Sequence, residues 1–205
     1  MQSITKREYA SLEDAYRFFD EKLFGGVLPD CLIVLHRKAN SRGYFIYERF
    51  ESRGGIDDKP DELALNPDAF IGRSDIEILS TLVHEQAHVW QHHHGDRPTG
   101  GYHDRQWAEK MESIGLMPSS TGQPGGKRTG KKMTHYIIPG GRFEVVAAEL
   151  FDGGFKLNWQ SPSAPAKEKP KSKVKYTCGC CGLNAWAKPD VHLMCGECEI
   201  TLTSE

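Results

Sequence analysis

The pentapeptide His84-Glu85-Gln86-Ala87-His88 is the segment of this chain with the clearest potential for chemistry. In a helix, positions four residues apart lie on one face, about 6 Å apart along the axis, so the imidazoles of His84 and His88 can converge on one zinc ion. Glu85 lies beside them, where it can accept a proton from a water molecule activated by the metal. The pattern therefore predicts a catalytic zinc site with Glu85 as the general base.

Such a site needs a third protein ligand, and the same helix cannot supply it. His92 lies on the same face, but about 12 Å from His84 along the axis, and three side chains spaced along a straight helix cannot surround one ion. We therefore interpret residues 92–94, all histidines, as a polar and exposed helix end.

The third ligand is expected after a reversal of the chain. Residues 95–101 (GDRPTGG) have the composition of a turn, and His103 follows them directly. We favour His103 as the third ligand. Glu109 and Glu112 are the rivals, because some zinc peptidases use a downstream glutamate.

A second metal site is predicted near the end of the chain, where two C-x2-C pairs are separated by 13 residues. Four thiolates at this spacing form a closed tetrahedral site, a zinc ribbon, whose metal contributes much of the folding energy. The expected ligands are Cys178, Cys181, Cys195 and Cys198. Cys180 is an alternative to Cys178 or Cys181 as a ligand, and His192 is a weaker alternative ligand. The chain is thus expected to bind two Zn²⁺ ions, one catalytic and one structural.

Basic and aromatic residues in and beside the ribbon indicate DNA or another nucleic acid as a partner. Lysines there can bind phosphates, and Trp186 can stack on unpaired bases. The basic loop at 127–132 is a second candidate for the same contact, and a merely solvated lysine-rich linker is the plain alternative. The candidate contact residues are Lys127, Arg128, Lys131, Lys132, Lys171, Lys173, Lys175 and Trp186.

The charge distribution is compatible with such a partner. Residues 1–120 hold 14 Lys and Arg against 20 Asp and Glu, whereas residues 121–205 hold 12 against 8. The chain has no apolar run near the roughly 18 residues that span a bilayer and no signal-peptide pattern at its start. Its cysteines cluster as in a metal site of a reducing compartment. We expect a cytoplasmic protein without a membrane partner.

Hydrophobic periodicity and turn signals predict an α+β fold in which a helix carries the metal site. Residues 1–160 form the main domain, 161–173 a linker and 174–205 the ribbon. Ser74 and Glu77 form a capping box that opens the site helix. Helices are expected at 11–24, 75–93 and 103–114, and strands at 31–35, 44–50, 62–65, 135–138, 142–150 and 155–159.

Five motifs in this order resemble the SprT-like metallopeptidases, which include the Spartan proteases that degrade proteins crosslinked to DNA. The resemblance covers about residues 10–115. The motifs are Leu23-Phe24-Gly25-Gly26-Val27-Leu28-Pro29, Gly43-Tyr44-Phe45, Leu63-Ala64-Leu65-Asn66-Pro67, His84-Glu85-Gln86-Ala87-His88 and His103-Asp104-Arg105-Gln106-Trp107.

The resemblance implies a minimal zincin: helices packed on a small mixed or antiparallel sheet, zinc held by three histidines, and the helix glutamate as base. Many such proteins also carry a C-terminal zinc-binding segment. Family members often have glycine and phenylalanine where this chain has Tyr102 and Trp107. We interpret Trp107 as a packing variation. Tyr102 either packs in the return loop or lies over the metal as an oxyanion donor.

These features together predict a zinc-dependent endopeptidase whose substrate is an unfolded or loosely held protein, including one attached to DNA. The alternative is a nucleic-acid-binding accessory protein whose zincin body is only a scaffold. Glu85 discriminates between the two, because metal binding alone does not need it. A small-molecule hydrolase using the same metal site is a third, weaker option.

Overall fold

The computed structural model describes residues 3–55, 59–98, 100–162 and 173–204. The chain divides into two compact units, Met1–Ser163 and Ala164–Glu205. The first contains α1 (Ile4–Phe19), the π-helix η1 (Asp20–Phe24), β1 (Cys31–Leu35), β2 (Gly43–Ile46), β3 (Asp61–Leu65), the 3-10 helix η2 (Pro67–Phe70), α2 (Asp75–His94), α3 (Arg105–Ser113), β4 (Leu116–Ser119), β5 (Thr134–Ile137) and α4 (Arg142–Asp152). The second contains β6 (Val174–Thr177), β7 (Asn184–Ala187) and β8 (Thr203–Ser204).

A small mixed sheet forms one layer of the first unit. Its strand order is β1-β3-β2, with β1 parallel and β2 antiparallel to β3. Every residue of β3 is buried, as expected for a central strand covered by a helix. β2 is shorter than the predicted strand at 44–50 and lies at the edge of the sheet.

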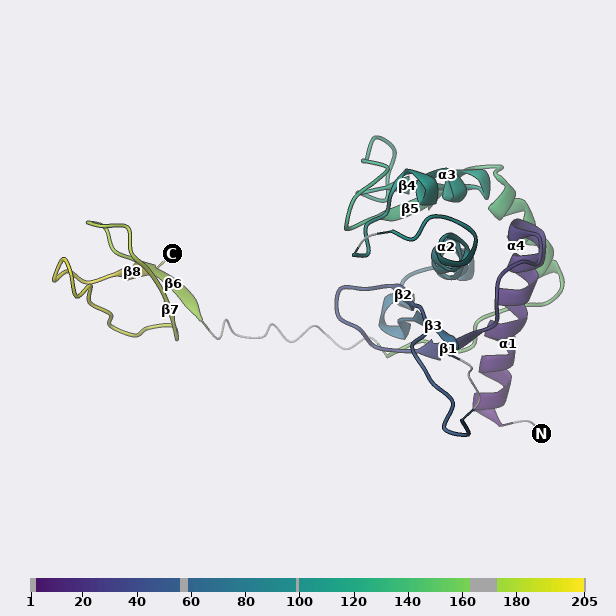
Figure 1. Ribbon diagram of the computed structural model, residues 1–205, viewed down its shortest axis with the longest axis horizontal. Helices are drawn as coiled ribbons and strands as arrows, with labels where there is room; N and C mark the ends of the chain where they lie inside the picture. The colour runs from purple at the N-terminus through teal and green to yellow at the C-terminus, as the bar shows by residue number, and fades with distance from the viewer. Residues whose placement is uncertain (1–2, 56–58, 99, 163–172, 205) are drawn as a thin grey trace. The chain divides into compact units, whose positions relative to one another are not determined.

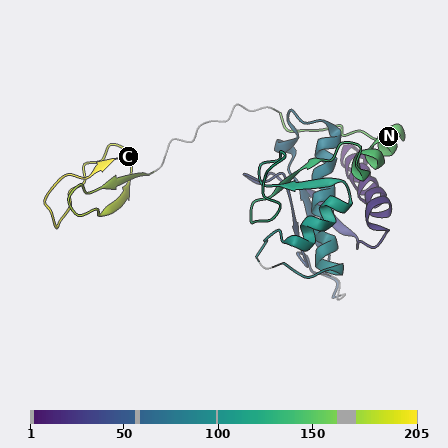
Figure 2. The same cartoon turned by 90° about the horizontal axis from the view of Figure 1, so that it is seen from above.

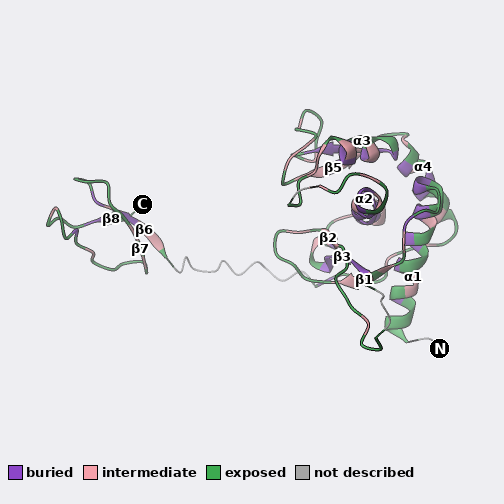
Figure 3. Ribbon diagram, in the orientation of Figure 1, coloured by how far each residue is buried: buried purple, intermediate pink, exposed green. Residues whose placement is uncertain are grey.

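Helix α2 is the centre of the first unit. Figure 1 shows it end-on, with the sheet on one side, α3 and the β4–β5 hairpin on the other, and α1 and α4 along its flank. It begins at the predicted capping box, where the Glu77 carboxylate accepts a hydrogen bond from the Ser74 backbone N–H at 2.8 Å. Most of its residues are buried, polar ones included (Figure 3). The chemistry-bearing residues therefore lie inside the unit.

Helix α1 begins earlier than predicted. Ser3 is its N-cap and accepts a hydrogen bond from the Lys6 backbone N–H, whereas Ser11 lies inside the helix. Figure 2 shows α1 beside α2 from above. The apolar residues of the helix predicted at 11–24 are buried along one side. They are Leu12, Ala15, Tyr16 and Phe19 of α1 and Leu23 of η1.

The C-terminal strands predicted at 142–150 and 155–159 are wrong. Residues Arg142–Asp152 form helix α4, because Phe143, Val146 and Ala147 share the face that packs into the core. No strand is assigned within the described residues 153–159. Strand β4, which pairs with β5, was not predicted.

The predicted linker begins with a residue that packs against the first unit. Ser161 is buried, and its backbone N–H donates to the Pro67 carbonyl while its hydroxyl accepts from Arg37. Residues 163–172 lie outside the described part of the chain.

These elements confirm the predicted α+β class. None of the described helices has the length and apolarity needed to cross a bilayer.

Cys31 is the first residue of β1, and its Sγ lies 3.5 Å from the hydroxyl of Tyr16 in α1. Burial raises the pKa of its thiol to about 12. Compared with the usual value of 9.0, the thiolate fraction near neutral pH is lower by about 10³-fold. We expect iodoacetamide to alkylate the exposed Cys180 of the folded chain long before Cys31, as read by peptide mass spectrometry. Denaturant should make Cys31 reactive, and equal rates in the folded chain would contradict this placement.

Candidate metal centres

Three histidines converge between α2 and the start of α3. His84 and His88 lie one turn apart on α2, and His103 approaches from the loop before α3. One ring nitrogen from each lies within 4.8 Å of the others. Tetrahedral ligands at zinc bonding distance are roughly 3.3 Å apart, so small side-chain rotations suffice to accommodate the ion. The three imidazoles therefore fit a zinc ion with an open fourth position.

Burial keeps these imidazoles neutral, which is the state that binds metal. It lowers the pKa of His88 to about 3 and that of His84 well below its usual range. The pKa of His103 is also lowered by burial, with a hydrogen bond to Gly130 acting in the opposite direction.

His103 is held by the loop that precedes β5. Its backbone N–H donates to the Gly130 carbonyl at 2.9 Å, and the Gly130 N–H donates back at 3.0 Å. The His103 Nδ1 also lies 3.1 Å from the Gly130 carbonyl oxygen, which can only accept, so Nδ1 carries the proton. The Nε2 atom is thereby left as the metal donor. Gly100 and Gly101, both with positive φ, supply the chain reversal that the sequence indicated.

Trp107 forms the floor of this cluster. Its ring stacks on His88 at 5.3 Å between centroids and meets His84 and His103 edge-on at 5.0 and 4.5 Å. Asp104 caps α3 by accepting from the Trp107 backbone N–H and also binds Gln91 of α2. The structure thus places Trp107 in the core, as its predicted packing role requires, and in contact with all three imidazoles.

His135 of β5 is a buried partner of this cluster that the sequence did not reveal. Its Nδ1 lies 3.0 Å from Nδ1 of His84, and its Nε2 lies 2.9 Å from the Ser80 hydroxyl. Burial, with Arg73 and Arg42 nearby, lowers the pKa of His135 to about 3. His135 lies 51 residues after His84 in the sequence, and such a separation does not indicate that the two side chains meet.

Glu85 is buried beside the histidines, and this burial raises the pKa of its carboxyl to about 8, with Lys38 acting in the opposite direction. Gly43 of strand β2 makes room for it. A Cβ atom at position 43 would lie 2.8 Å from the Ala64 carbonyl oxygen and 3.0 Å from Oε1 of Glu85. The edge strand therefore approaches the carboxylate as closely as a glycine allows.

Gly43→Ala is expected to displace either the Glu85 carboxylate or strand β2. Because the Ala64 carbonyl belongs to the central strand and cannot yield, we expect a loss of roughly 1–3 kcal/mol in the free energy of unfolding, as measured by thermal unfolding. Gly54→Ala is the matched control, because its new Cβ would make only an ordinary contact, 3.6 Å from Oγ of Ser52. Unchanged stability in Gly43→Ala would show that the close approach is unimportant.

The two glutamates considered as alternative third ligands form ion pairs away from the histidine cluster. Glu109 and Glu112 are exposed on α3, where they form ion pairs with Arg105 and Arg128. Neither belongs to a group of convergent metal-donor side chains among the described residues. His103 is the downstream residue that the fold brings to His84 and His88.

The interpretation of residues 92–94 as an exposed helix end is wrong for His92. That side chain is buried and stacks on Tyr47 with 4.4 Å between ring centroids. His93 bonds the buried Asp61 at 2.6 Å, and His94 bonds the Val27 carbonyl. These histidines tie the end of α2 to the sheet and to the loop after η1.

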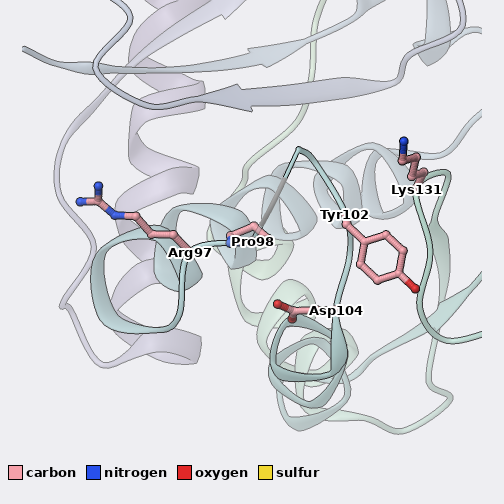
Figure 4. A pocket seen from close by; sticks show the side chains of 5 residues that line it. All are labelled: Arg97, Pro98, Tyr102, Asp104 and Lys131. Carbon is pink, nitrogen blue, oxygen red and sulfur yellow. The ribbon is translucent and has the colours of Figure 1, made fainter.

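A shallow pocket of about 370 Å³ opens next to His103, lined by Arg97, Pro98, Tyr102, Asp104 and Lys131 (Figure 4). The Tyr102 ring turns toward the segment that carries Lys131, whereas Arg97 points away from it. Tyr102 is 42% exposed, so more than half of its surface is covered by neighbouring residues. Packing in the return loop and donation to an oxyanion both stay predictions for Tyr102.

The four predicted ribbon cysteines gather in the second unit, with one sulfur from each within 4.8 Å of the others. Sγ of Cys181 and Sγ of Cys195 are 3.7 Å apart, close to the roughly 3.8 Å expected between sulfurs around zinc. Backbone N–H groups of Cys181 and Cys180 lower the pKa of Cys178 to about 6. This cluster is compatible with a zinc ribbon.

Both cysteine turns have the same backbone geometry. The N–H of Cys178 donates to the carbonyl of Leu183, and the N–H of Cys195 donates to that of Ile200. Each first cysteine also accepts from the fourth residue after it. Cys180 is exposed and lies outside the sulfur group, as the spacing predicted.

The predicted nucleic-acid contacts lie in two places. Lys127, Lys131 and Lys132 are exposed on the loop that binds His103, where Arg128 is already paired with Glu112. In the ribbon, Lys175 and Trp186 are directly opposite each other on β6 and β7, and Trp186 is 62% exposed. Lys173 is exposed before β6. Lys171 lies outside the described residues.

A helix with the His-Glu-x-x-His sequence packed on a small mixed sheet defines the class as a minimal zincin. The chain belongs to the SprT-like family, whose model matches residues 12–129. This membership supports a zincin-type metalloprotease.

One relative is an uncharacterized protein in the mucB 3' region of Salmonella typhimurium, 47% identical over 49 residues. The match covers 24% of this chain and 66% of that protein, so the chain spans just under two thirds of the relative's length. No solved structure matches the chain.

Proposed function

We propose that this protein is a zinc-dependent endopeptidase with His84, His88 and His103 as metal ligands and Glu85 as general base. The observation that carries the proposal is the convergence of three neutral imidazoles beside a buried carboxyl group. When bound, zinc acts as a Lewis acid that lowers the pKa of a water molecule to about 7 and polarises the scissile carbonyl. The donor set, three nitrogens and an open position, is that of catalytic rather than structural sites.

Glu85 moves the protons in this scheme. Its carboxylate takes a proton from the water whose oxygen attacks the peptide carbonyl carbon, and it then delivers that proton to the amide nitrogen as the C–N bond breaks. Burial supports this role, because a carboxylate whose pKa is raised is a stronger base than an exposed one and takes a proton from water more readily.

The edge strand supports an extended peptide as substrate. Within the described residues, β2 pairs with β3 and with no strand on its other edge, so that edge offers backbone groups to a further strand. A peptide added there would run past Gly43 and hence past Glu85. A folded protein cannot present such a strand easily, which favours unfolded or loosely held substrates.

We further propose that the ribbon unit directs this activity to proteins on DNA. The pairing of Lys175 with an exposed Trp186 supports phosphate and base contacts, as do the exposed lysines at 127–132. The alternative, a nucleic-acid-binding accessory protein, would use the same contacts but would not cleave its partner proteins.

Incubation of the zinc-loaded chain with an unfolded protein, free or crosslinked to single-stranded DNA, separates these functions. The proposal predicts fragments that a chelator abolishes, formed faster from the DNA-linked substrate. Equal cleavage rates for the free and the DNA-linked substrate would contradict the role of DNA but not the endopeptidase activity. If neither substrate is cleaved by chain that has its full zinc content, the scaffold alternative replaces the enzyme.

A further inference from the structure

A continuous set of hydrogen bonds connects His84 to the backbone of its own helix. Nδ1 of His84 lies 3.0 Å from Nδ1 of His135, whose Nε2 lies 2.9 Å from the Ser80 hydroxyl oxygen. That hydroxyl lies 2.7 Å from the Glu77 carbonyl oxygen. His84, His135 and Ser80 are all buried.

The Glu77 carbonyl oxygen, at the end of this series, determines which atom donates in each hydrogen bond. The Glu77 carbonyl has no proton to donate, so the Ser80 hydroxyl must donate its only proton there. The Ser80 oxygen can then only accept from His135, whose Nε2 must carry a proton. A neutral His135 consequently presents a lone pair at Nδ1, and His84 must donate to it from its own Nδ1.

The opposite arrangements are unfavourable. If Ser80 donated to His135, its oxygen would face the Glu77 carbonyl oxygen at 2.7 Å with no proton between them. A second proton on His135 would create a buried cation whose two ring nitrogens face His84 and Ser80, with no carboxylate from the described residues bonded to them to balance the charge. The neutral series with protons on Nδ1 of His84 and Nε2 of His135 is the arrangement that satisfies every atom in it.

We propose that His135 is a positioning residue of the zinc site, which holds His84 in the tautomer that leaves Nε2 free to bind the metal. This inference rests on the proposed zinc site. His103 receives the equivalent restraint from the Gly130 carbonyl. Partners of this kind fix the ring orientation of metal-binding histidines and contribute roughly 10- to 100-fold to metal affinity.

The tautomers can be measured without metal or substrate. Long-range ¹⁵N–¹H correlation spectra of the zinc-free full chain, assigned with His84 and His135 variants, identify the protonated nitrogen of each ring. We expect a proton on Nδ1 of His84 and on Nε2 of His135. A His84 ring protonated at Nε2 would overturn the proposal, and this tautomer is read from the wild-type chain itself.

The effect on zinc affinity is tested by chelator competition on the full chain. His135→Leu should weaken binding at the histidine site roughly 10- to 100-fold, and His135→Asn, which keeps an acceptor for His84, should restore most of the affinity. His36→Leu makes the same substitution at an exposed site and should change nothing. Thiolate-to-cobalt absorption of the cysteine site, after Co²⁺ substitution, serves as an internal control.

These measurements distinguish a failure of the proposed zinc site from a failure of the proposed role of His135. If the wild-type chain binds no zinc at the histidines, the proposed function is wrong. If the wild type binds zinc and His135→Leu binds it equally tightly, only the role of His135 is wrong.

Discussion

Glu85→Gln is expected to lower the rate of peptide cleavage by roughly 10²- to 10⁴-fold while the protein keeps its full zinc content. The amide fills the same buried space beside His84 and His88 but cannot accept and return a proton. Cleavage of an unfolded protein, followed by gel electrophoresis with elemental analysis of the same sample, measures both quantities. The retained zinc separates a lost base from a lost metal site.

Glu109→Gln is the matched control for this substitution. Glu109 is exposed and forms a surface ion pair with Arg105, which contributes little to stability. We expect wild-type zinc content and wild-type cleavage. A Glu85→Gln protein that cleaved as fast as this control would show that another group moves the protons.

Cys195→Ser is expected to unfold the second unit of the chain and leave the first unit intact. The ribbon has a small apolar core in which Cys178 and Cys195 are themselves buried, together with Tyr176 and Leu202. Such a unit depends on its metal, and zinc bound to four thiolates contributes on the order of 10 kcal/mol or more. Amide NMR spectra should lose the dispersed signals of β6, β7 and β8 and keep those of the first unit.

Cys180→Ser provides the control within the same turn. Its thiol is exposed and lies outside the sulfur cluster, so the ribbon should remain folded and retain its metal. A Cys195→Ser protein with an unchanged ribbon spectrum would mean that the cysteines are not needed to hold the unit together.

The parts of the site that are local in sequence could be predicted. His84 and His88 are one helical turn apart, and His103 follows a glycine-rich reversal, so spacing alone indicated their convergence. The ribbon cysteines are likewise two short local pairs. The family resemblance indicated helices packed on a small mixed or antiparallel sheet, which hydrophobic patterns do not determine.

The parts that depend on distant contacts could not be predicted. His135 reaches His84 only because β5 pairs with β4, and Pro118 in β4 masks that strand in the sequence. Val145 and Val146 suggested a strand after a Pro-Gly-Gly turn, but packing of Phe143 and Ala147 into the core favours helix α4. His92 is buried because Tyr47, from a loop far away in sequence, covers it.

Whether one zinc ion binds all three histidines can be decided by anomalous diffraction at the zinc edge from crystals of the zinc-loaded full chain. We expect a peak at about 2.0–2.1 Å from one nitrogen of each of His84, His88 and His103, with no bond to Glu85. A fully loaded protein with no peak there, or with a peak from which His103 is absent, would contradict this expectation.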